Sequence, residues 1–146
     1  MKVLKHVVAG ILSVGLVSFS FAASQEKSLY ERLGGKPALE VVAKDLSDAM
    51  AKDDQLKKYC GNIKGERKEK ALANLVSFLC MATGGPCKYT GPDMETAHKK
   101  LGITGKDWDR FVTIAVKVLD KHKVPEKEKN ELLTAVASLK DKIVSK

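Results

Sequence analysis

The sequence has few aromatic residues and lacks the short cysteine motifs that mark common cofactor and metal sites. Aromatic side chains make up 5% of the 146 residues, and none is interleaved with a stripe of basic residues. Nucleic-acid surfaces combine these two features, so a nucleic-acid partner is disfavoured despite the net charge of +8. The chain has no CxxCH motif, which excludes the usual cytochrome-type attachment of a cofactor, and no CxxC pair for zinc or thiol exchange.

The N-terminus carries an apolar stretch that is short for a membrane span. Two lysines precede this stretch at residues 7–21, and the small residues Ser20 and Ala22 occupy the two positions that a signal peptidase reads. The stretch is serine-rich, and no cysteine stands directly after the expected cut, where a lipid anchor would be attached. We therefore expect residues 1–22 to be a signal peptide and residues 23–146 to be one exported domain, periplasmic or secreted. An uncleaved N-terminal anchor is the alternative.

Three cysteines, Cys60, Cys80 and Cys87, follow the expected cut. An oxidising compartment permits a disulfide, and the odd number leaves one thiol over or pairs it between chains. Cys80 lies near the end of a helical pattern and Cys87 just after the glycine-rich turn at 84–86, so a Cys80–Cys87 disulfide would join the two sides of this turn. Two buried thiols, a bridge that involves Cys60, and a thiolate of Cys60 that binds a metal stay open.

All long regular segments have helical periodicity, which predicts an all-α domain. The helices are expected to start near Pro37, to span Glu66–Ala82, to start after the cap formed by Thr104 and Asp107, and to start at Pro125. Their apolar stripes are expected to face the core. These stripes are Leu39, Val42, Leu46 and Met50; Ala71, Leu75, Phe78 and Ala82 beside Leu72, Val76 and Leu79; Trp108, Phe111, Val112, Ala115 and Leu119; and Leu132, Leu133, Val136, Leu139 and Ile143.

A short helix between Pro92 and Gly102 carries one histidine. Met94, His98 and Leu101 lie at i, i+4 and i+7, which places His98 on the inward face. The residues alone leave two alternatives open for His98. It is either a core histidine that bonds a backbone carbonyl or a metal ligand. Zinc needs three or four close ligands, whereas a haem iron needs one imidazole and an apolar slot. The side chains that could form this slot are Leu75, Phe78, Met94, Ile103, Trp108 and Phe111. The same side chains could equally form an ordinary hydrophobic core.

Several short motifs occur in a fixed order along the chain. They are SLYERLGG at 28–35, AKDDQL at 51–56, GGP at 84–86, YTG at 89–91 and AHKKLGIT at 97–104. Together they resemble the group 1 truncated haemoglobins over residues 28–144. The resemblance implies a two-over-two helical sandwich around one non-covalent haem b, with His98 as the proximal iron ligand. It also implies that Tyr89 bonds a haem propionate and that Leu46 and Met94 lie against the cofactor, while His122 is expected at the surface of a helix end.

The resemblance fails on the side of the haem opposite His98. Many family members place there a tyrosine that bonds dioxygen, and this position matches Ser47. The other matched positions are smaller or less polar than in the family, namely Leu46, Ala71, Leu75 and Cys60. Because serine is shorter than tyrosine, Tyr59, Asn74 or a pocket water would have to donate in its place. We therefore expect dioxygen to dissociate faster than from members that have the tyrosine.

The resemblance implies a haem protein that reversibly binds dioxygen, nitric oxide or carbon monoxide, for oxygen binding or transport. A haem enzyme is the alternative, either a nitric oxide dioxygenase that needs an electron-donor protein or an enzyme that removes peroxide. The lack of a visible distal histidine weakens the peroxide version. A third hypothesis is a haem-free exported helical binding module in which His98 is only structural.

Overall fold

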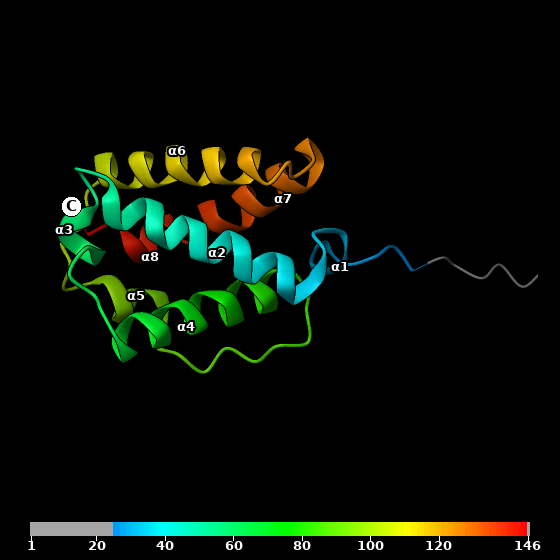
Figure 1. The fold of residues 1–146 in the computed structure, drawn as a ribbon, viewed down its shortest axis with the longest axis horizontal. Coiled ribbons are helices and arrows are strands. Elements are labelled where there is room, and N and C mark those ends of the chain that lie inside the picture. The colour runs from blue at the N-terminus through cyan, green and yellow to red at the C-terminus, as the bar shows by residue number, and fades with distance from the viewer. Residues whose placement is uncertain (1–24, 146) are drawn as a thin grey trace, which may run out of the picture.

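The computed structural model describes residues 25–145, and every regular element among them is a helix (Figure 1). The helices are α1 (Leu29–Arg32), α2 (Gly35–Lys52), α3 (Lys57–Cys60), α4 (Glu66–Ala82), α5 (Met94–His98), α6 (Gly105–Lys121), α7 (Glu126–Ala137) and α8 (Lys140–Ile143). The predicted all-α class is confirmed, while the expected signal peptide at 1–22 lies outside the described residues. Within residues 25–145, no helix has both the length and the apolar character needed to cross a bilayer.

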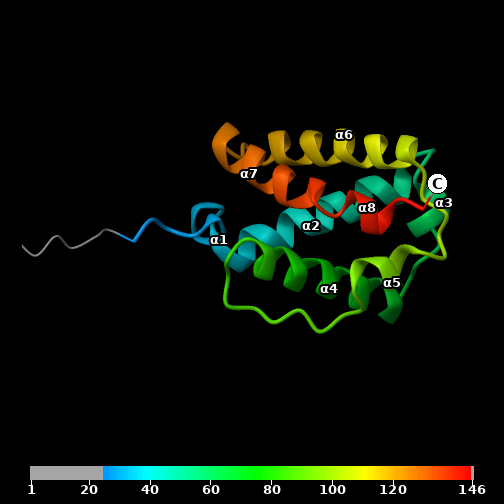
Figure 2. The same cartoon turned by 180° about the vertical axis from the view of Figure 1, so that it is seen from behind.

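The long helices form two pairs. Helix α2 packs against α4, and α6 packs against α7, while α2 also contacts α6 and so joins the pairs. Figure 1 shows α6 and α7 along the top, α4 at the bottom and α2 crossing between them. From behind, α5 and α8 lie at the same end of the molecule, where they pack together (Figure 2). This arrangement confirms the predicted two-over-two sandwich.

The buried core consists of two clusters that share α2 and α6. The first cluster lies where α2, α4, α6 and α7 meet, and its buried members are Leu39, Ala43, Val76, Leu79, Cys80, Leu119 and Leu132. The second lies between α2, α6 and the segment before α3, and its buried members are Leu46, Leu56, Ile114, Ala115 and Val118. Burying each of the Leu, Ile and Val side chains in these clusters stabilises the fold by about 1.5–3 kcal/mol. The predicted stripes on α2, α6 and α7 each contribute buried members to the core, and Ala43 is added between them. The stripe of Ala71, Leu75, Phe78 and Ala82 was wrongly expected to face the core: Ala71 and Ala82 are exposed and the other two are half-buried, because α4 buries the neighbouring stripe of Val76 and Leu79 instead.

Two predicted helical features are wrong. The last helix was expected to run unbroken from Pro125, but it stops at Ala137 and resumes at Lys140. There the Ser138 hydroxyl donates to the carbonyl of Ala135 at 2.6 Å, and the Leu139 N–H donates to the carbonyl of Val136, three residues back. These bonds tighten the turn and interrupt the α-helix. Likewise, α5 ends at His98, so Leu101 no longer continues its inward face and is 41% exposed.

A tight turn ends α4, and two glycines make it possible. Gly84 has a φ of 83°, its N–H donates to Met81, and the Gly85 N–H donates to the carbonyl of Cys80. This pattern of bonds satisfies the last carbonyls of the helix and favours glycine at the left-handed position. At Gly85 a Cβ would lie 2.6 Å from the Tyr30 ring and 2.7 Å from Cys80 Sγ. The first glycine therefore supplies the backbone conformation and the second supplies the space.

The same turn brings Cys87 beside Cys80. Their Cα atoms lie 5.7 Å apart and the two residues form a disulfide, which confirms the predicted pair. Closing a loop of this length stabilises a fold by about 2–3 kcal/mol through loss of unfolded-state entropy. Cys60 keeps a free thiol, and burial raises its pKa. Its Sγ lies 3.6 Å from the carbonyl of Leu56, so the thiol has a partner within its own helical turn.

A buried carboxylate joins α3 to the start of α6. Asp107 is 3% exposed and forms the expected capping box with Thr104. It also accepts hydrogen bonds from the Tyr59 hydroxyl at 2.6 Å and from the Gln55 amide at 3.0 Å. The bonds from Tyr59, Gln55 and the Thr104 N–H hold the pKa of Asp107 well below its usual range. The ionised form is therefore the one that the fold stabilises.

Replacing Asp107 by asparagine is expected to lower the unfolding free energy at pH 7 by about 1.5–3 kcal/mol, because the bonds to a charged acceptor are lost. The wild-type pKa lies below the unfolded value near 3.9, so this contribution is present above about pH 4 and is lost as pH falls through the folded pKa. Urea unfolding at pH 7 and pH 3 should show the variant and wild type closer at pH 3. The control is Asp54→Asn, since Asp54 is 97% exposed. An equal loss for Asp107→Asn at both pH values would contradict the role of its charge.

Candidate functional site

His98 lies at the C-terminal end of α5, a helix of five residues. Asp93 caps the helix by accepting the Thr96 N–H at 2.9 Å. His98 Nδ1 lies 2.8 Å from the carbonyl oxygen of Met94, so Nδ1 carries the proton and donates it. Nε2 then keeps its lone pair, and no hydrogen bond to Nε2 occurs within the described part of the chain. A carbonyl on one ring nitrogen and a free lone pair on the other is the arrangement of metal-binding histidines.

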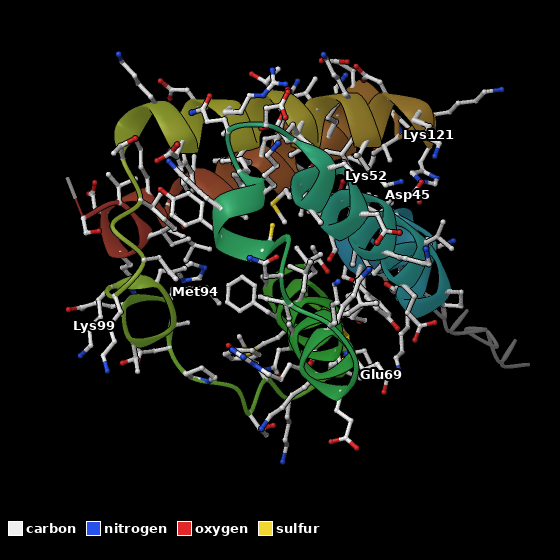
Figure 3. The ribbon with its side chains drawn as sticks, turned by 60° about the vertical axis from the view of Figure 1, so that its left-hand side comes forward. Asp45, Lys52, Glu69, Met94, Lys99 and Lys121 are labelled. Carbon is white, nitrogen blue, oxygen red and sulfur yellow. A yellow bond between two sulfur atoms is a disulfide. The ribbon has the colours of Figure 1, made fainter. Side chains whose placement is uncertain are left out.

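The apolar side chains predicted to surround a flat cofactor remain half-buried. This group consists of Leu75, Phe78, Met94, Ile103 and Phe111. By contrast, the sixth predicted residue, Trp108, is 5% exposed. Figure 3 shows Met94 on the inner side of α5, toward the other helices, and Lys99 on its outer side. The inner side of α5 therefore faces apolar side chains that are half-buried, whereas the members of the two core clusters are buried.

A cavity of about 290 Å³ lies between α4, α5 and α8. Three predicted residues, Phe78, Tyr89 and Met94, line it together. The other lining residues are Asp93, Glu95, Leu139 and Lys142. No sequence pattern marked them as pocket residues, although Leu139 belongs to the predicted apolar stripe of the last helix. The charged members come from α5 and α8, and a packing contact between two short helices leaves no periodic pattern in the sequence.

Tyr89 connects the loop before α5 to α4. Its ring meets that of Phe78 edge to face, with centroids 5.3 Å apart. Its hydroxyl donates to the carbonyl of Pro92 at 2.5 Å, and burial raises its pKa. A Cβ at Gly91 would lie 2.6 Å from this hydroxyl, so the residue must be glycine for the tyrosine to turn back. The hydroxyl serves the loop here, and the bond to a propionate stays a prediction.

The remaining predicted pocket residues do not line this cavity. Trp108 and Phe111 pack together, with ring centroids 5.5 Å apart, and Phe111 borders the second core cluster. Leu46 belongs to that cluster, and Leu75 packs against the first. The structure thus brings the predicted residues to adjoining parts of the interior rather than to one cavity.

The residues expected on the opposite side of the site differ in what they offer. Ser47 on α2 and Asn74 on α4 are half-buried, whereas Ala71 is exposed. The Tyr59 hydroxyl donates its proton to Asp107, so in this arrangement it has none for another acceptor. Of the predicted polar side chains, Tyr59 is therefore committed to Asp107, while Ser47 and Asn74 are half-buried.

The third histidine of the chain is a structural partner. His122 is the C-cap of α6, where a surface position was expected. Its side chain is 23% exposed, and Nε2 lies 2.8 Å from Asp45 Oδ2 on α2. This hydrogen bond joins the end of α6 to α2. It involves no residue of α5, the helix that carries His98.

Comparison with known proteins identifies the family. The family model described as bacterial-like globin matches residues 28–145. The group 1 truncated hemoglobin GlbN of Mycolicibacterium paratuberculosis is 31% identical over 125 residues, which cover 86% of this chain and 90% of that protein. The chain belongs to the group 1 truncated hemoglobins. The GlbN of Synechocystis sp. is 30% identical over 116 residues, which cover 77% of this chain and 88% of that protein.

A solved structure supports the fold separately. The truncated hemoglobin of Tetrahymena pyriformis in its Fe(III) form superimposes with a TM-score of 0.75 at 22% identity, over 82% of this chain and all of that chain. At this identity the likeness concerns the fold alone. Membership in the family makes this chain a haem globin, a class that binds diatomic gases.

The residues of the site fit a haem. One imidazole nitrogen with a free lone pair suffices as the protein ligand, and a flat apolar macrocycle requires apolar walls. The half-buried set around Phe78 and Met94 supplies these walls on α4 and α5. Lys142 lines the cavity beside Phe78 and Met94, and its charge suits a carboxylate there, whereas His98 itself is not among the residues that line this cavity.

Proposed function

We propose that this truncated hemoglobin holds haem b through His98 Nε2 and reversibly binds a diatomic gas, dioxygen first, on the face opposite the histidine. One observation carries the proposal: Nδ1 of His98 is bonded to the Met94 carbonyl, which leaves Nε2 unprotonated on a helix whose inner side is apolar. The haem supplies the iron at which the gas binds. The chain supplies the ligand, the apolar enclosure and the polar groups near the gas.

Each residue has a distinct role in this proposal. The Met94 carbonyl fixes the tautomer and the ring orientation of His98. Leu75, Phe78 and Met94 exclude water from the iron and hold the macrocycle by apolar contact. On the opposite face, Ser47 occupies the position where many related proteins have a tyrosine, and it supplies a hydroxyl there. Because the reduced iron binds dioxygen, an electron-donor protein belongs to the proposal as a partner.

Export to an oxidising compartment is part of the same proposal. Its support is the N-terminal pattern of two lysines, an apolar stretch and small residues at 20 and 22. The Cys80–Cys87 disulfide adds to this, because disulfides persist outside the reducing cytosol. Export and cleavage after residue 22 are tested together by the N-terminal sequence of the protein recovered from the periplasm or medium.

Optical spectra of the purified protein test the haem proposal. We expect one equivalent of hemin to give a Soret band, which shifts on reduction and shifts again under carbon monoxide. Circular dichroism of the same samples confirms that the chain is helical. A helical protein that takes up no hemin would overturn the proposal and leave a haem-free binding module as the function.

A further inference from the structure

A long irregular loop delivers the histidine helix to its place. It begins after Ala82 and ends at Asp93, the cap of α5. Figure 2 shows the loop leaving the end of α4 near α1 and running back alongside α4 to reach α5 at the other end of the molecule. The position of α5 along α4 therefore depends on how the loop is held.

The structure holds this loop to α4 at two points. The first is the disulfide from Cys87 to Cys80, whose side chain is fully buried in the core. The second is the edge-to-face contact of Tyr89 with Phe78, two residues further along the loop. Gly85 packs directly on Cys80 Sγ, so the disulfide is built into the turn as well as into the loop. Both attachment points lie between the end of α4 and the start of α5.

Helix α5 has little means of holding its own position. Five residues are too few to form a stable helix without tertiary contacts. On its C-terminal side the chain is held by a bond from the Ser145 N–H to the Ile103 carbonyl at 2.9 Å, and α5 packs against α8. On its N-terminal side the only covalent tie to the core is the disulfide, among the residues that the structure describes.

We infer that the Cys80–Cys87 disulfide is a positioning element for His98, and that oxidation of this pair completes the haem site. The inference rests on the proposed function of His98. With the pair oxidised, the loop has a fixed length between the core and Asp93, and His98 Nε2 keeps one orientation. With the pair reduced, the contact of Tyr89 with Phe78 and the hydrogen bonds of the Gly84–Gly85 turn remain, but no covalent cross-link ties the loop to α4, and α5 samples several positions.

Reduction of the pair is an ordinary thiol–disulfide exchange. A dithiol such as dithiothreitol attacks one sulfur, displaces the other as a thiolate and then closes to its own disulfide, so two electrons and two protons pass to Cys80 and Cys87. A chain that leaves a reducing compartment thus reaches its slowest haem dissociation only when Cys80 and Cys87 are oxidised. Haem retention is thereby linked to the compartment in which the protein works.

The test compares wild type, Cys80→Ser/Cys87→Ser and the control Met81→Ser, which changes an exposed side chain next to Cys80 on α4 and leaves the disulfide. Haem transfer to excess apomyoglobin measures the dissociation rate. We expect the double variant to release haem on the order of tenfold faster or more, as loss of support around a metal ligand usually does. Met81→Ser should match wild type.

Two further measurements separate positioning from general stability. Resonance Raman spectra of the reduced protein report the iron–imidazole bond, and this band should broaden or shift in the double variant. Amide hydrogen exchange should accelerate at residues 88–101 on reduction by dithiothreitol, while the core segments of α2 and α6 stay protected. If the double variant does not fold, dithiothreitol treatment of the loaded wild type, followed by reoxidation, gives the same comparison in one protein.

The outcomes distinguish this inference from the proposed function. Equal haem release, an unchanged Raman band and equal exchange in the loop would overturn the positioning role and leave haem binding intact. If the oxidised wild type takes up no hemin, the proposed function fails and the inference fails with it.

Discussion

Replacing His98 by glycine is expected to abolish stable haem binding while leaving the helical fold. The Nδ1 bond of His98 stays within α5, and neither core cluster includes the residue, so the fold loses little. Loss of a support residue behind a metal ligand costs about 10–100-fold in affinity, and loss of the ligand itself should cost more. Hemin titration followed at the Soret band measures the change.

The matched control is His122→Gly, because His122 bonds Asp45 between α6 and α2. This variant should bind hemin as wild type does. Added imidazole should restore a wild-type-like band in His98→Gly, since it can occupy the space of the lost ring. Wild-type affinity in His98→Gly without imidazole would show that another residue holds the iron.

The second large effect is expected at Ser47, where the family commonly has tyrosine. Ser47→Tyr should slow dioxygen release by about 10–100-fold, because a donor to the partly negative bound gas contributes about 1–3 kcal/mol. Ser47 is half-buried on α2, and Tyr59 is engaged with Asp107 and does not compensate. Stopped-flow displacement of dioxygen by carbon monoxide measures the rate.

Ser47→Phe is the control for this prediction, since phenylalanine fills the same space without a hydroxyl. It should not slow release as the tyrosine variant does. Slow release from the wild type, unchanged in Ser47→Tyr, would mean that a different donor already serves the gas, and Asn74 would then be the residue to replace.

Much of the fold could be predicted from local sequence patterns. The bounds of α4 at Glu66 and Ala82, the capping box at Thr104 and the Cys80–Cys87 pair all follow from residues close together in the chain, and all are confirmed. The break between α7 and α8 was missed because no glycine or proline marks it. There a serine hydroxyl competes for the backbone instead, and its effect depends on the packing around it.

The site was predictable only in part for a related reason. The bond of His98 to the Met94 carbonyl follows from their spacing, and the role that we propose for His98 rests on the family motifs. The partnership of Tyr59 with Asp107 joins residues 48 positions apart, and the lining of the cavity by Lys142 joins α5 to α8. Long-range contacts of polar side chains leave no period in the sequence, so they appear only when the helices are placed in space.

The most direct measurement is a crystal structure of the hemin-loaded protein with diffraction data collected at the iron absorption edge. We expect one iron peak, bonded to His98 Nε2 and flanked by Phe78 and Met94. An iron peak bonded to Cys60 or another residue, or a His98 Nε2 that faces only protein, would contradict the assignment.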